Sequence, residues 1–324
     1  MAAAQQQQLK QPPPAALPPP APLASFQEWL DLPADSNTSL SIVQALDPKQ
    51  CVLDYWNQST RPDGRLLAQC RPTKVVCGML QHAAGSALVT QQTETSSTKL
   101  LAATSLQVGQ PAPEQPDHGE VVVQVSGTGG HYVERGEVHW DYLQAWLQRC
   151  VSESDIPSRL NLLTGKACLR LVVSMVVLQD GGNLLDAALL ACMAAWKDTR
   201  LPQVGRDLME SNHKLWWKQG AQLSSVTDEK EMDDDSTASS APRDYRISLT
   251  MGIYQSSQKT THFIVDPSAQ EEPFLDGTLT MTVGIHSGRL QLECTGKIPL
   301  SATDLALAAK LAKARAAELS NILQ

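Results

Sequence analysis

Four carboxylates lie close together directly after an expected strand, in the segment VDPSAQEEPFLDGT at residues 265–278. They are Asp266, Glu271, Glu272 and Asp276. Carboxylates grouped in this way can bind a divalent metal ion, or can serve as a general acid and a general base. The same grouping is also typical of a solvated turn. The residue types alone favour the turn and leave the chemistry open.

Two arginines, Arg61 and Arg65, flank a Pro-Asp-Gly sequence in the segment RPDGR. Proline fixes φ and the Asp-Gly pair tolerates positive φ, so the segment predicts a turn. Arginines at such a turn can contact the phosphates of a nucleic acid, or they can pair with carboxylates. Ion pairing is the commoner role for isolated arginines of this kind.

The remaining motifs carry weaker signals. The glycine-rich SGTGGH, residues 126–131, follows an expected strand and could cradle a phosphate. Its spacing matches neither the P-loop nor the dinucleotide fingerprint, so a plain loop is the better prediction. The histidines show no HExxH spacing and the cysteines no CxxC pair. We therefore predict no metal site and no cofactor.

The elements that must position these residues follow from hydrophobic periodicity. The order of elements is strands, helix, strand, helix, strands, helix, which predicts an α+β fold with β-sheets packed with helices. Helices are expected over 39–58 with a break near Pro48, and over 138–150, 184–196 and 301–323. Strands are expected over 73–80, 85–92, 98–108, 119–126, 166–179, 244–255, 261–267, 277–287 and 289–296.

Two of the expected helices begin with polar residues that can cap them. Asn183 is predicted to cap the helix at 184–196, and Asp186 in its first turn is favoured by the helix dipole. A catalytic role for Asp186 is the alternative. Ser301 with Asp304 forms a capping-box-like start for the last helix.

The composition narrows the class of protein. The chain has 324 residues, of which 42% are apolar, enough for a sizeable core. Its net charge of −8 argues against binding a polyanion through overall charge. Seven cysteines, several inside apolar runs, indicate reduced and buried thiols of an intracellular protein. No run of 18 apolar residues is present, so no membrane span is expected.

Two segments lack the apolar content of a folded domain. Residues 1–38 are rich in glutamine and proline and are expected to form a disordered tail, without the features of a transit or secretory signal. Residues 39–324 are expected to form the folded domain, interrupted by a disordered loop near 221–242. This loop includes TDEKEMDDD, with six acids and one lysine.

An ordered set of segments resembles the RNase PH-like proteins, and among them the ring subunits of the RNA exosome that act in ribosomal RNA processing. The segments are RPDGR, GSALV, APEQPDHG before EVVVQV, DGGNLLDAALLACMAAW and FIVDPSAQEEPFLDGTLTMTV. The resemblance covers about residues 39–323. It implies the RNase PH fold (ribosomal protein S5 domain 2-like).

The resemblance also implies partners and a location. They are the other RNase PH-like subunits of a six-membered ring, the S1/KH cap subunits, and RNA that passes through the central channel to a separate nuclease. The expected location is the nucleus, including the nucleolus, and the cytoplasm, without a membrane. A different β-rich interaction module that reuses the fold is a further alternative.

Catalytic members of the family need arginines and a serine near a helix start to bind phosphate. Here the helix start reads HYVERGEVHWDY, with Arg135 between Glu134 and Glu137. Carboxylates at this place repel phosphate. Arg61, Arg65 and Arg135 are the candidates for RNA contact.

Catalytic members also need two aspartates in the late acidic segment. An ungapped comparison places Glu272 and Thr278 at these positions, and a shift of two residues would let Asp276 serve instead. The resemblance therefore implies a non-catalytic structural subunit with a vestigial acidic segment. An active phosphorolytic 3′–5′ exoribonuclease is the alternative.

Overall fold

The computed structural model describes residues 46–127, 137–201, 224–225, 244–256, 260–296 and 298–323. The chain divides into two units, residues 1–51 and residues 52–324. Helix α3 (Pro48–Asn57) begins in the first unit, and Pro48, where a break was predicted, is its first residue. All elements that follow belong to the second unit.

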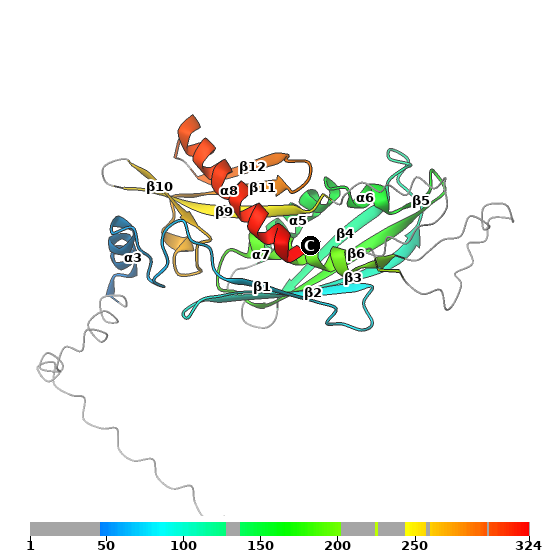
Figure 1. The fold of residues 1–324 in the computed structure, drawn as a ribbon, viewed down its shortest axis with the longest axis horizontal. Helices are drawn as coiled ribbons and strands as arrows, with labels where there is room; N and C mark the ends of the chain where they lie inside the picture. Colours follow the sequence, from blue (N-terminus) through cyan, green and yellow to red (C-terminus); the bar gives the residue numbers. More distant parts are fainter. Residues whose placement is uncertain are drawn as a thin grey trace, which may run out of the picture. The chain divides into compact units, whose positions relative to one another are not determined.

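The first sheet has the strand order β1-β2-β3-β6-β4 (Figure 1). Strand β4 runs parallel to β6, and the other neighbours are antiparallel. A short β5 pairs with one end of β6. The strands are β1 (Thr73–Cys77), β2 (Gly85–Gln92), β3 (Ser97–Gly109), β4 (Glu120–Gly127), β5 (Asn161–Leu163) and β6 (Ala167–Gln179).

The second sheet is antiparallel throughout, in the order β10-β9-β11-β12. Strands β7 and β8, of two residues each, pair with each other in a separate two-stranded sheet. The strands are β7 (Arg200–Leu201), β8 (Ser224–Ser225), β9 (Arg246–Gln255), β10 (Thr261–Val265), β11 (Gly277–Gly284) and β12 (Leu290–Gly296), with the 3-10 turn η2 (Glu272–Phe274) between β10 and β11.

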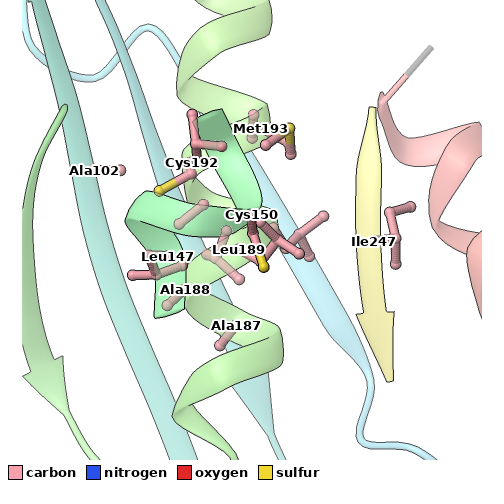
Figure 2. Packing of buried hydrophobic residues seen from close by; sticks show 14 of the residues in the cluster. Ala102, Leu147, Cys150, Ala187, Ala188, Leu189, Cys192, Met193 and Ile247 are labelled. Carbon is pink, nitrogen blue, oxygen red and sulfur yellow. The ribbon is translucent and has the colours of Figure 1, made fainter. Parts of the chain in front are cut away.

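Helix α7 (Leu184–Asp198) forms the centre of the core and contacts strands of both sheets. Its sequence is apolar on nearly every side, which is typical of a helix covered all round. Figure 2 shows Leu189 and Cys192 of α7 close to Leu147 and Cys150 of α5 (Glu137–Ser152). A one-turn helix, α6 (Ile156–Arg159), follows α5.

The second sheet is covered on both faces. Thr250 of β9 bonds to Asp186 of α7, whereas its neighbour Leu249 lines a cleft with Leu311 of α8 (Ala302–Leu323). Successive side chains of a strand point to opposite faces, so α7 and α8 cover opposite faces of β9. This explains why β9 is buried along almost its whole length.

Helix α8 begins with the predicted capping box. The Asp304 N–H donates to Ser301 Oγ at 3.2 Å, and the Ser301 N–H donates to Asp304 Oδ2 at 3.0 Å. The Ser301 hydroxyl also donates to Asp304 Oδ2 at 2.7 Å, and the hydroxyl and N–H of Ser301 together lower the pKa of Asp304. The helix buries the small residue Ala312 against the sheet.

The predicted α+β class and all nine predicted strands are confirmed, with strand ends shifted by a few residues. Sequence periodicity missed α6, β5, β7, β8 and η2, which are too short to show a period. The tail at 1–38 lies outside the described residues, as does most of the loop at 221–242, so their predicted disorder stays a prediction. No helix in the described ranges is long and apolar enough to cross a membrane.

Candidate functional site

The structure brings the acidic segment against the arginines of the RPDGR turn. Glu271 and Arg61 are 210 positions apart in sequence and form a two-bond ion pair. The acidic residues follow β10, and the turn follows α3. The two sequence motifs singled out for chemistry therefore form one cluster.

Arg61 is 1% exposed, and each of its guanidinium nitrogens has a protein partner. Its Nε donates to Glu271 Oε1 at 2.9 Å, and its Nη2 pairs with Oε2 of the same carboxylate. Its Nη1 donates to the Val265 carbonyl at 2.7 Å, and Nη2 also donates to the Asp266 carbonyl at 2.9 Å. Burial opposes ionisation of Glu271, but the hydrogen bonds and charge of Arg61 outweigh it and lower the pKa of Glu271.

Arg71 donates more hydrogen bonds within the cluster than Arg61 or Arg65 does. Its Nε and Nη2 donate to the two carboxylate oxygens of Asp266 at 2.9 and 2.8 Å, and its backbone N–H donates to Oδ2 at 2.8 Å. The same guanidinium donates to the Gly181 and Gly182 carbonyls at 3.1 and 2.9 Å. Arg71 thus ties the end of β10 to the segment that leads from β6 into α7.

Arg65 extends this network at its margin. Its Nε donates to Asp63 Oδ2 at 2.7 Å, and its Nη1 donates to Asp266 Oδ2 at 3.2 Å. Both guanidinium groups are buried in ion pairs, and the RNA contact of Arg61 and Arg65 stays a prediction. Arg135 lies outside the described residues, and its RNA contact stays a prediction.

Asn183 stands at the N-cap position of α7 as predicted, but its side chain makes no cap hydrogen bond. It has a positive φ of 50°, and its Nδ2 donates to Asp186 Oδ2 and to Asp266 Oδ1, both at 2.8 Å. Its backbone N–H donates to Glu272 Oε1 at 2.7 Å. The Asn183 amide donates to the carboxylates of Asp186 and Asp266 instead of bonding to the backbone of the first helical turn. Glu272, which is distant in sequence, accepts the Asn183 backbone N–H at the start of the helix.

Asp186 of α7 is bonded to Thr250 of strand β9. Its two oxygens accept hydrogen bonds from the Thr250 N–H at 2.7 Å and the Thr250 hydroxyl at 2.9 Å. Burial raises the pKa of Asp186. The hydrogen bonds from Thr250 favour the carboxylate form, but they do not outweigh the effect of burial. Asp186 thus joins α7 to strand β9 of the second sheet.

The last two members of the acidic segment lie away from the ion cluster. Asp276 is exposed, and its Oδ2 accepts the Gln255 N–H at 3.0 Å. The Thr278 hydroxyl lies 2.6 Å from that of Thr295 on the neighbouring strand. Asp276 is thus the exposed carboxylate of the segment. Within the described ranges, no three His, Cys, Asp or Glu residues are placed to hold a metal ion.

The ion cluster makes the stability of the protein sensitive to acid. Burial opposes ionisation of Asp266, but its bonds to Arg71 dominate and lower its pKa from 3.8 to about 2. Because the folded-state pKa is the lower one, Asp266 stabilises the fold fully above about pH 5. We expect about 2 kcal/mol of this stability to be lost as the pH falls through 3.8 towards 2.

Carbon-detected NMR titration of the Asp266 carboxyl group measures this directly in the folded protein. A titration midpoint near 2 is the expected result. A midpoint at the ordinary aspartate value would show that Arg71 does not hold the carboxylate in solution.

Comparison with known proteins agrees with this architecture. Residues 69–202 match the RNase_PH family model, described as the 3′ exoribonuclease family, domain 1. The solved structures that resemble the chain include an Archaeoglobus fulgidus exosome with RNA bound to the active site, with a TM-score of 0.65 and 24% identity over 87% of this chain and 100% of that one. Another is rice Rrp46, with a TM-score of 0.54 and 19% identity over 81% and 97% of the two chains. Residues 69–202 therefore match an RNase PH domain, and the chain has the fold of these exosome proteins.

The curated relatives narrow this class further. The exosome complex component Rrp42 of Methanopyrus kandleri is 28% identical over 229 residues, which cover 69% of this chain and 75% of the relative. The protein of the same name from Sulfurisphaera tokodaii is 28% identical over 276 residues, covering 82% and 89% of the two chains. Both of these relatives are thus exosome components named Rrp42.

Proposed function

We propose that this chain is a non-catalytic structural subunit of an exosome-type ring, in support of 3′–5′ RNA processing and degradation. The observation that carries the proposal is that carboxylates of the acidic segment form ion pairs inside the fold. Asp266 and Glu271 are buried in ion pairs with Arg71 and Arg61, and Glu272 accepts a hydrogen bond at the start of α7. The ion pairs of Asp266 and Glu271 support a structural role for these two carboxylates rather than a role in metal binding or proton transfer.

The relatives support the assembly part of the proposal. Their printed names are those of exosome components, and the structures of the same fold are exosome cores. The proposed partners are the other RNase PH-like ring subunits, the S1/KH cap subunits, and RNA in the channel. The proposed locations are the nucleus, including the nucleolus, and the cytoplasm.

Mass spectrometry of the native complex tests this assembly. The full chain, tagged at its C-terminus and expressed at its natural level, is expected to copurify with several other RNase PH-like proteins in equal amounts. A chain that elutes as a free monomer, or with none of these proteins, would overturn the proposal. A matched preparation with the tag on an unrelated cytosolic protein identifies background binding.

A further inference from the structure

Strand β4 is the last strand of the first sheet, and its outer edge has no neighbouring strand among the described residues. It runs parallel to β6, from Glu120 beside Arg170 to Gly127 beside Val177, without a register shift. The backbone groups of every second residue face β6, and those of the residues between face outward. An open edge of this kind is a template on which another chain can add a strand.

The side chain of Gln148 in α5 bonds to this edge as a neighbouring strand would. Its Oε1 accepts the Val123 N–H at 2.8 Å, and its Nε2 donates to the Val121 carbonyl at 2.6 Å. A residue of a parallel strand makes the same two bonds, to the C=O of one residue and to the N–H of the residue two positions further on. The Nε2 also donates to Ser152 Oγ at 3.1 Å, which holds the amide in this orientation.

Gln144 continues this pattern one helical turn before Gln148. Its Oε1 accepts the Val125 N–H at 3.1 Å. Four residues of a helix rise by about 6.0 Å, and two residues of a strand rise by about 6.6 Å. Because these two distances are similar, side chains four residues apart on a helix can meet alternate residues of a strand beside it. The glutamine pair, Gln144 and Gln148, is therefore in register with Val125 and Val123.

Other contacts position α5 beside β4. Leu147 and its apolar neighbours on the helix belong to the hydrophobic core. On another side of α5, the Tyr142 hydroxyl donates to Glu293 Oε1 at 3.0 Å, and Arg149 forms an ion pair with the same carboxylate. Apolar packing and this ion pair thus hold the helix in place without the help of the glutamine pair.

We propose that the glutamine pair blocks strand addition at β4. Its side-chain amides occupy the outward groups of Val121, Val123 and Val125, with which the backbone of another chain would pair. The occupant of the edge is thus a helix of the same chain. An added strand would have to displace both amides before it could bond to β4. This proposal does not rest on the proposed function, since it requires neither RNA nor ring subunits.

The double variant Gln144→Ala with Gln148→Ala tests the blocking. Alanine favours the helix and removes every bond from the pair to the edge. Gln124→Ala is the matched control, because it makes the same chemical change on β4 itself, where the exposed side chain stands on the face of the sheet. Sedimentation equilibrium of the full chain measures self-association. We expect the double variant to self-associate at a concentration at least tenfold lower than the wild type, and the control within threefold of it.

Val125→Pro, added to the double variant, shows which surface the association uses. The Val125 N–H points away from β6, so proline removes an outward donor and keeps the bonds between the two strands. Self-association is expected to return to within threefold of the wild type. Association that persists in this triple variant would overturn the proposal, because it would use a surface other than the edge of β4.

Hydrogen exchange measured by NMR tests the proposal in the unaltered chain. The amides of Val123 and Val125 are expected to exchange within tenfold of the rates of Val122 and Gln124, whose N–H groups face β6. In the double variant, only the two outward amides should exchange at least tenfold faster. Fast exchange of these two amides in the wild type would overturn the proposal. Unchanged self-association of the double variant would also overturn it, because the glutamines would then bond to the edge without excluding another chain.

Discussion

Arg71→Ala is expected to lower the free energy of unfolding by about 3–5 kcal/mol, because it leaves the buried Asp266 carboxylate without its main partner. Arg71 is 1% exposed and donates to both oxygens of that carboxylate. It also donates to the carbonyls of Gly181 and Gly182, which would lose a buried donor. Urea unfolding at pH 7, followed by circular dichroism, measures the change.

Arg289→Ala is the matched control, because it removes the same charge from an exposed position. Its free energy of unfolding is expected to stay within about 0.5 kcal/mol of the wild type. An Arg71→Ala variant as stable as this control would mean that the ion cluster contributes no net stability. The structural role assigned to Asp266 would then fail.

The purified chain, supplied with RNA, phosphate and magnesium, is expected to release no nucleoside diphosphates. Phosphorolysis needs a group that can donate a proton, and Thr278 at one expected acidic position carries only a hydroxyl, which lies 2.6 Å from the Thr295 hydroxyl. Loss of a general acid alone costs about 10²–10⁴-fold in rate. Chromatography of labelled diphosphates, with and without phosphate, measures the release.

The variant that combines Glu272→Ala with Asp276→Ala is the control for this assay. Asp276 is exposed and is the member of the acidic segment best placed to act as an acid. Phosphate-dependent release that disappears in the double variant would show that the activity depends on Glu272 or Asp276. The chain would then be an active phosphorolytic exoribonuclease.

The elements of the fold were predictable because each carries its own period. The alternation in β3 and the apolar surface of α7 are visible within about 15 residues, which is the range over which sequence patterns act. Short elements such as β5 have three residues and no period. Their existence depends on the strands that they pair with.

The ion cluster was not predictable in the same way. The sequence drew attention to Arg61 and to the acidic segment, but Arg71 stood outside any motif. Its partner is 195 residues away, and nothing local indicates that the two meet. Asn183 shows the same limit in part. Its side chain bonds to Asp186, three residues further on, and to Asp266, which only the tertiary fold brings near it.

The long separation between the arginines and their carboxylates has a consequence for how the chain is made. Arg71 is synthesised 195 residues before Asp266, and Arg61 is synthesised 210 residues before Glu271. At about 5–20 residues per second, each arginine waits roughly 10–40 s for its partner. During that interval the guanidinium groups lack their carboxylate partners, and any part of the first sheet that forms does so without these ion pairs. Closure of the cluster is therefore a late step, which occurs after most of the chain has left the ribosome.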